Sequence, residues 1–527
     1  MRTTYTLLYL LLYSQLSLKA QSLQRGFDVQ HYTFTIQLSD VNDTIKGQAT
    51  VTIKALRDLT TLPFDLVKQN NKGKGMLVSS IKEGQKNISF VQDSAVVHII
   101  SSPLKNSLHS YTITYQGIPA DGLIISVNKF GHRTFFGDNW ANRAHNWLPC
   151  ADYPDDKASV DFIVTAPNHY QVVANGLQIE DSLLPNQLRR THWRETAALP
   201  TKVMVIGVAD FKIDHVGNIA GIPVSTYVFP ENKAEGFKSY AVAKEILPFY
   251  IRKIGPFAYG KLANVQSKTI YGGMENASAI FYFENSVNTK DIEELMAHEI
   301  AHQWFGDAAT EKDFSNLWLS EGFATYMTNL YLENKYGPDT LKKRLIGDRA
   351  AVIRFEKKRF TPLVDTSRTK DLTELLNTNP YKKGSWVLHM LRRKLGDNIF
   401  WQGIRNYYAK YNGGNASTDD LRKVLEQTSG QDLKLFFKQW LYTAGHPQIN
   451  VNWKYNTAKG NLELTITQKQ QDLFDFPLQI VIDGQSHLIH INKQNTVVQF
   501  SATAKPGTFI ADPDVNLLAG IEVTETK

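Results

Sequence analysis

Two histidines four positions apart are the residues of this sequence most suited to chemistry. His298 and His302 lie in the run His-Glu-Ile-Ala-His, with Glu299 directly after the first of them. If the run is helical, both imidazoles lie on one face a turn apart and can bind one tetrahedral zinc ion. Glu299 would lie beside that ion without being a ligand, where a carboxylate can act as general base for the attacking water.

A third ligand is expected nineteen residues after the second histidine, at Glu321. A catalytic zinc ion commonly has two histidines, one carboxylate and an open position for water. Trp318 and Phe323 flank Glu321 at the start of a second helical pattern, so its side chain should be buried and in need of a partner. We therefore predict one Zn²⁺ per chain on His298, His302 and Glu321, although cobalt or manganese would suit the same donors.

These residues and their spacing resemble the signature of the gluzincin zinc aminopeptidases, the family of aminopeptidase N and the leukotriene hydrolase. A second signature of that family lies upstream, as the run Gly272-Gly273-Met274-Glu275-Asn276. The resemblance implies that this run borders the substrate and that Glu275 binds its free α-amine. The two glycines would let the backbone approach the substrate closely. A carboxylate opposite an ammonium makes a charge-assisted hydrogen bond that an acylated N-terminus cannot make.

A third likeness to the family is the run Pro380-Tyr381-Lys382-Lys383-Gly384. The resemblance implies that the Tyr381 hydroxyl donates to the oxyanion of the tetrahedral intermediate, where negative charge develops. It further implies a zinc metallo-aminopeptidase, which hydrolyses the N-terminal residue from peptides by attack of a zinc-bound water. The expected partners are peptide substrates with a free N-terminus.

Three positions depart from the family pattern. Many members have a polar or acidic residue where Trp140 stands, two residues after Asp138. A tryptophan face attracts a cation but forms no ion pair, so either Asp138 replaces the missing group or Glu275 acts alone. The family usually has Asn and Asp where this chain has Asp307 and Asn316. We hypothesise that the exchange keeps one carboxylate and one amide near the metal ligands.

Two other functions stay open on the sequence alone. Trp140 leaves room for a related enzyme with another reaction, such as an endopeptidase or an epoxide hydrolase. The second alternative is a zinc-free scaffold that binds peptides, because a fold does not fix a function. Activity on N-acetylated peptides would favour the first alternative, and metal analysis of the purified protein would identify the second.

The composition is that of an ordinary globular protein. The 527 residues are 42% hydrophobic and 21% charged, with a formal net charge of +7 and a pI near 9.0. Lys and Arg are scattered, whereas a nucleic-acid footprint would gather them on one face, so we expect no nucleic-acid partner. The single cysteine, Cys150, excludes an internal disulfide and is expected to be buried. We expect a monomer.

The first twenty residues are typical of a cleaved signal peptide. Arg2 gives a basic start, residues 7–12 form an apolar run too short to span a bilayer, and Ala20 offers a cleavage point before Gln21. We therefore expect a periplasmic or secreted protein with no stable membrane insertion.

Hydrophobic periodicity divides the rest of the chain into three parts. It alternates as in strands from about residue 27 to 210, has mainly helical spacing to about 445, and alternates again afterwards. We expect a multidomain α+β protein. After the signal peptide (1–20) come an N-terminal all-β domain (21–212), a mainly helical zinc catalytic domain (213–446) and a small C-terminal β-sandwich (447–527). By resemblance the middle domain is thermolysin-like. Helical spacing covers 233–253, and helices are also predicted over 291–305 and 317–336. A strand is predicted over 476–482, followed by a hairpin turn at Asp483-Gly484.

Overall fold

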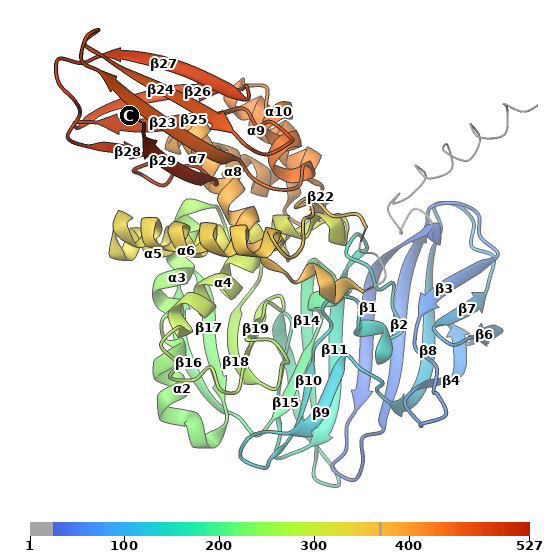
Figure 1. The fold of residues 1–527 in the computed structure, drawn as a ribbon. Helices are drawn as coiled ribbons and strands as arrows, with labels where there is room; N and C mark the ends of the chain where they lie inside the picture. Colours follow the sequence, from blue (N-terminus) through green and yellow to red (C-terminus); the bar gives the residue numbers. More distant parts are fainter. Residues whose placement is uncertain (1–24, 368–370, 527) are drawn as a thin grey trace, which may run out of the picture.

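The computed structural model describes residues 25–367 and 371–526. Figure 1 shows strand-rich regions near both ends of the chain and a helical region between them. The predicted signal peptide, residues 1–20, lies outside the described residues and stays a prediction.

The N-terminal region is a set of sheets whose strands alternate between buried and exposed residues. In β1 (Phe27–Gln37), for example, Tyr32, Phe34 and Ile36 are buried. The largest sheet has the order β13 (Leu177–Leu184), β14 (Leu188–Pro200), β11 (Lys157–Pro167), β1, β2 (Ile45–Ala55), β8 (Leu108–Ile118), β4 (Gly75–Glu83), β5 (Lys86–Asn87). Two smaller sheets have the orders β12 (Gln171–Ala174), β15 (Ile206–Ala209), β10 (Arg133–Gly137), β9 (Leu123–Val127) and β3 (Thr61–Asp65), β7 (Val96–Ile100), β6 (Phe90–Gln92).

A five-stranded sheet follows and carries part of the predicted site. Its order is β16 (Lys212–Ile219), β17 (Ile222–Val228), β18 (Leu262–Ser267), β20 (Ala279–Phe283), β19 (Gly273–Met274). β17, β18 and β20 are parallel neighbours, and β19 pairs antiparallel at the edge. Because β19 lies at this edge, the residues that follow it are free to face the helices.

The predicted helices over 291–305 and 317–336 are present as α4 (Ile292–His302) and α5 (Trp318–Tyr336). α4 ends before residue 305 because the chain turns at Gly306, whose φ is 119°. The other helices are α2 (Lys233–Tyr240), α3 (Ala243–Lys253), α6 (Pro338–Glu356), α7 (Gly384–Leu395), α8 (Asp397–Tyr411), α9 (Thr418–Ser429) and α10 (Lys434–Phe437). In Figure 1, α5 and α6 (yellow) cross the middle of the molecule, between the red C-terminal strands and the green and blue sheets.

The C-terminal strands form two sheets. Their orders are β27 (Asn495–Ser501), β24 (Asn461–Gln468), β23 (Gln448–Asn456), β29 (Gly520–Glu525) and β26 (Gln485–Ile491), β25 (Phe476–Ile482), β28 (Phe509–Ala511). The predicted turn joins β25 to β26, where Asp483 and Gly484 have φ of 47° and 83°. The multidomain α+β class is therefore confirmed. The domain boundaries at 212 and 446 stay predictions.

A further expectation concerns the burial of Cys150. Cys150 is buried, as predicted, and burial raises the pKa of its thiol well above the usual value, which keeps the thiol unreactive. Across residues 25–367 and 371–526, the helices are all too short or too polar to cross a membrane.

Candidate active site

The three predicted metal ligands lie together. The Glu321 Oε2 atom is 3.3 Å from the Nε2 atoms of both His298 and His302, and the two Nε2 atoms are 3.1 Å apart. Ligands about 2.0–2.1 Å from a tetrahedral zinc ion stand roughly 3.3 Å from one another, so this donor set fits zinc in type and spacing. Among the described residues, this is the cluster of three potential ligands whose donor atoms could share one ion.

Helix α4 presents both histidines, and the start of α5 presents Glu321 to them. The Nδ1 atom of His302 lies 3.0 Å from the Phe305 carbonyl oxygen and 3.0 Å from Ser320 Oγ. With Nδ1–H donating to that carbonyl, the Nε2 lone pair of His302 faces the metal position. Ser320, directly before Glu321, was not predicted as a site residue.

Burial and mutual charge set the protonation of the two glutamates of the site. Burial alone would raise the pKa of Glu321, but His302 and the hydrogen bond from His298 hold that pKa well below its usual range. Burial raises the pKa of Glu299 well above its usual value, and the charges of Glu275 and Glu321 add to the effect. Glu321 is thus suited to bind a cation, and Glu299 to accept and hold a proton.

Glu275 is held in place through its backbone. The side-chain amide of Gln303 donates to the Glu275 carbonyl oxygen at 2.7 Å, and its Oε1 atom accepts from the Ser278 amide at 2.8 Å. The Glu275 side chain is 6% exposed, and its Oε1 atom has no hydrogen-bond partner among the described residues. A buried carboxylate oxygen without a partner is costly, so this atom is prepared for a ligand. Gln303 was not predicted as a site residue, although it directly follows His302.

The two predicted glycines differ in their surroundings. A Cβ atom on Gly273 would lie 2.4 Å from Glu299 Oε1, whereas one on Gly272 would meet only Leu295, at 3.9 Å. The backbone of Gly273 therefore lies directly against the buried Glu299 carboxylate. The space next to the Gly272 Cα atom is open. Asn276 is fully buried.

Tyr381 lies in a short π-helical turn (Asn379–Lys383) directly before α7. Its ring stacks on that of His298, with centroids 6.1 Å apart and an interplanar angle of 14°. Burial raises the pKa of Tyr381 well above its usual value, and the charge of Glu321 raises it further. The hydroxyl therefore stays protonated and can donate a hydrogen bond into the site.

Asp138 does not face the site. Its buried carboxylate accepts from Thr269 Oγ1 at 2.9 Å and from the Ile270 amide at 3.1 Å, and it forms an ion pair with Arg143. Trp140 instead lines the same cavity as Glu275. Of the two alternatives left open by the sequence, the geometry favours Glu275 acting alone.

Asp307 and Asn316 are both held by hydrogen bonds of their side chains. Asp307 Oδ2 accepts from Gln303 at 2.9 Å, and Asn316 Oδ1 accepts from the backbone and side chain of Thr418, each at 2.8 Å. The side chains of Asp307 and Asn316 thus contact Gln303 and Thr418, and the backbone amide of Asp307 donates to the His302 carbonyl oxygen at 3.1 Å. The hypothesis that the exchange keeps one carboxylate and one amide near the metal ligands stays a prediction.

One cavity of about 320 Å³ is lined by every predicted site residue except Asn276. Trp140, Tyr271, Leu295 and Leu376 complete its lining. The structure thus brings together residues that lie more than a hundred positions apart in the sequence.

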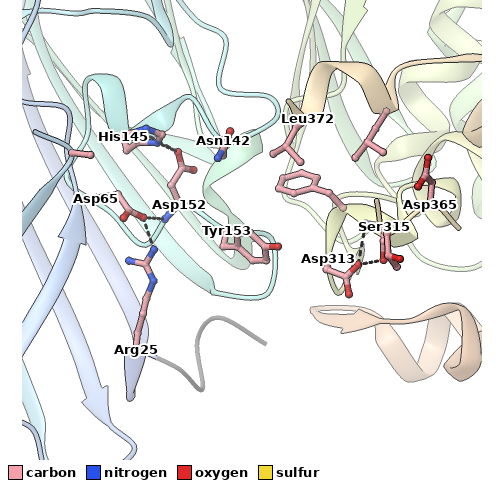
Figure 2. A pocket seen from close by; sticks show the side chains of 14 residues that line it. Arg25, Asp65, Asn142, His145, Asp152, Tyr153, Asp313, Ser315, Asp365 and Leu372 are labelled. Atoms are coloured by element: carbon pink, nitrogen blue, oxygen red, sulfur yellow. Dashed lines mark hydrogen bonds and ion pairs between the residues drawn. The ribbon is translucent and has the colours of Figure 1, made fainter. Parts of the chain in front are cut away.

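A second cavity, of about 350 Å³, lies between the N-terminal strands and the helical region (Figure 2). Most of its charged side chains already have partners. Arg25 contacts Asp65 at 2.6 Å, His145 contacts Asp152 at 2.6 Å, and Asp313 accepts from the Ser315 amide at 3.0 Å. These pairs indicate a structural role for the cavity.

Comparisons with known proteins agree with this geometry. The family model described as "Peptidase M1 N-terminal domain" matches residues 28–203, and "Peptidase family M1 domain" matches residues 239–440. Aminopeptidase 2 of Candida albicans is 26% identical over 476 residues, which cover 84% of this chain and 49% of that protein. Leucyl aminopeptidase of Saccharolobus solfataricus is 23% identical over 497 residues, which cover 90% of this chain and 61% of that protein.

The fold is also shared with a solved structure. The crystal structure of Legionella pneumophila aminopeptidase A in complex with aspartic acid has a TM-score of 0.80 and 17% sequence identity, and the match covers 94% of this chain and 60% of that one. The chain spans about half the length of the curated relatives it matches. With both family models matched in order over more than two thirds of its residues, the chain belongs to peptidase family M1.

Proposed function

We propose that this chain is a zinc-dependent aminopeptidase, which hydrolyses the N-terminal residue from peptides. One observation carries the proposal. The three donor atoms of His298, His302 and Glu321 share a cavity with the unpartnered carboxylate oxygen of Glu275. A metal site beside a free buried carboxylate can fix a peptide by both its first carbonyl and its ammonium.

His298, His302 and Glu321 would hold the zinc ion. When bound there, zinc supplies a Lewis acid that polarises the peptide carbonyl and makes water more acidic. The names of the relatives, which include aminopeptidase 2 and leucyl aminopeptidase, support the proposed reaction.

The chain's own residues would then perform the proton transfers. Glu275 pairs with the substrate ammonium and sets which peptide bond reaches the centre. Glu299 takes a proton from the attacking water, whose oxygen bonds to the carbonyl carbon, and gives that proton to the departing amine as the C–N bond breaks. The Tyr381 hydroxyl donates to the oxygen on which negative charge develops.

The first test compares aminoacyl-anilides with their N-acetylated counterparts, with and without a chelator. We expect hydrolysis of the free-amine forms only, lost on chelation and restored by zinc. Cleavage of both forms would instead indicate an endopeptidase. An absence of turnover in protein that holds zinc by metal analysis would contradict the proposed function.

The Glu299→Gln variant separates chemistry from metal binding. We expect it to keep one zinc per chain and to lose turnover by about a thousandfold or more, because the amide cannot accept the proton. Tyr381→Phe should retain zinc and lose about a hundredfold or more in kcat. Full turnover in either variant would remove that residue from its proposed role.

We also propose that the protein is exported, on the basis of residues 1–20, and that it is a monomer. Mass spectrometry of the mature chain should find an N-terminus at Gln21, and light scattering should give one chain per particle. An intact Met1 in the secreted or periplasmic fraction would contradict cleavage.

A further inference from the structure

Part of the site cavity is an aromatic and apolar surface next to Glu275. Trp140, Tyr271, Met274 and Leu376 line the cavity and belong to one apolar cluster. The rings of Trp140 and Tyr271 meet edge to face, with centroids 6.2 Å apart. Met274 directly precedes Glu275, so the apolar surface begins beside the carboxylate.

Arg143 and Asp138 hold this aromatic pair in place before any ligand binds. Arg143 Nε donates to the Trp140 carbonyl oxygen at 2.7 Å, and its guanidinium lies 6.0 Å from the Tyr271 ring centroid. The same guanidinium pairs with Asp138, which holds the backbone at Ile270. The loop that carries Tyr271 and the loop that carries Trp140 are therefore tied to one another.

The charges around the cavity restrict what can bind against this surface. The carboxylates that line it are Glu275, Glu299 and Glu321, and its lining contains no lysine or arginine. An acidic first side chain would meet like charge and no basic side chain in this lining. In an α-amino acid the ammonium and the side chain branch from one carbon, so an ammonium on Glu275 places the side chain near the apolar surface.

We propose that Trp140 and Tyr271 form the pocket for the first side chain and select peptides whose N-terminal residue is neutral and apolar, with Glu275 as the one partner of the ammonium. This inference rests on the proposed function. Trp140 and Tyr271 are specificity-determining residues, and Arg143 and Asp138 are positioning residues.

The test measures binding rather than turnover. Leucinamide, alaninamide, lysinamide and glutamic acid α-amide are titrated by calorimetry into the zinc-loaded Glu299→Gln protein, which should not hydrolyse them. We expect leucinamide to bind about tenfold or more tightly than alaninamide, because the larger side chain buries more apolar surface, and glutamic acid α-amide to bind more weakly than alaninamide. Tightest binding of the lysine or glutamate amide would overturn the proposal.

Variants assign the effect to the aromatic pair. Trp140→Phe should keep the order of affinities, whereas Trp140→Glu should favour lysinamide over leucinamide. Because Trp140 is only 3% exposed and its replacement by Glu can unfold the chain, Tyr271→Ala provides a second variant at a partly exposed position. Tyr271→Ala should weaken leucinamide by about tenfold and alaninamide by much less. Equal losses for both amides, or an unchanged ratio, would contradict the assignment.

N-acetyl-leucinamide separates this inference from the function on which it rests. If it binds as tightly as leucinamide, the ammonium anchor on Glu275 fails, and the proposed aminopeptidase activity with it. If it does not bind and the free amides show no side-chain preference, the aminopeptidase proposal stands and the apolar pocket fails.

Discussion

At the scale of single residues, the close approach of the Gly273 backbone to Glu299 shapes the site as much as the side chains do. Gly273 lies in β19, paired with Tyr282, and its Cα faces the buried carboxylate of Glu299. Glu299 is 5% exposed and has little room to withdraw. The position of Glu299, the proposed general base, therefore depends on the absence of a side chain at Gly273.

We predict that Gly273→Ala lowers kcat strongly, by about a hundredfold, because the new methyl group displaces the Glu299 carboxylate. Gly272→Ala is the matched control. A Cβ atom there meets only ordinary contact distance, so kcat should change by less than about threefold. Steady-state kinetics on one aminoacyl-anilide measures both. Equal effects of the two substitutions would show that Gly273 has no special relation to Glu299.

The sequence predicted the site residues whose chemistry follows a fixed spacing. His298 and His302 were found from helical geometry alone, because a separation of four residues fixes their common face. Tyr381 was found only by resemblance, since nothing in its neighbours sets it apart from the other tyrosines. Gln303 and Ser320 were missed because their roles depend on hydrogen bonds between segments that only the fold brings together.

At the scale of elements, the close approach of two helices brings Tyr381 to the metal ligands. A Cβ atom on Gly322 of α5 would lie 3.0 Å from the Cα and carbonyl carbon of Gly384 and 3.0 Å from the Pro380 carbonyl oxygen. These are backbone atoms, which cannot move aside as a flexible side chain would. The two glycines thus set the distance between the helix that carries Glu321 and the turn that carries Tyr381.

We predict that Gly322→Ala pushes α5 and α7 apart, lowers the free energy of unfolding by about 1–3 kcal/mol and reduces kcat. Gly347→Ala in α6 is the matched control, because a Cβ atom there meets no atom within 4 Å. In an open helical position, alanine should stabilise by about 0.5–1 kcal/mol and leave kcat unchanged. Urea unfolding and kinetics of both variants provide the check. A stabilised Gly322→Ala protein with normal kcat would contradict the packing argument.

Elements with one buried face were predictable, but their boundaries were predictable only where a turn marks the end of the element. β25 (Phe476–Ile482) coincides with the predicted strand because alternation and the following turn define both its faces and its end. The helical spacing over residues 233–253 corresponds instead to two helices, α2 and α3, separated at residues 241–242. Hydrophobic spacing reports which residues are buried, and it does not report where the backbone turns between them.

At the scale of the whole molecule, the turn between β12 and β13 in the N-terminal region holds the segment that follows β19. Asn175 donates to the Ala277 carbonyl oxygen at 2.6 Å, and the Gly176 amide donates to Ser278 Oγ at 2.8 Å. Both acceptors lie within three residues of Glu275. The N-terminal region therefore helps to position the segment that carries Glu275, the proposed amine anchor.

Lys261 also connects the N-terminal region to the segment that follows β19, and its protonation makes the free energy of unfolding depend on pH. Its Nζ atom donates to the carbonyl oxygens of Ala174 and Ser278, each at 2.9 Å. Burial lowers the pKa of Lys261 to about 7 from 10.5, although the charge of Glu195 partly opposes this. Between about pH 7 and 10.5 the unfolded chain therefore binds a proton at this lysine that the folded chain does not. Because the unfolded state then holds more protons, the contribution of Lys261 to stability rises with pH through this window and is flat below it.

We predict that the stability of the natural chain relative to a Lys261→Met variant improves by about 1–3 kcal/mol between pH 7 and pH 9.5. The exposed Lys86→Met substitution serves as control and should show no such change, because its ammonium is hydrated in both states. Urea unfolding of the three proteins at the two pH values measures the differences. If the difference in free energy of unfolding between the natural chain and Lys261→Met is the same at both pH values, Lys261 keeps its proton on folding. The carbonyl oxygens of Ala174 and Ser278 would then be bound by a charged lysine instead of a neutral amine.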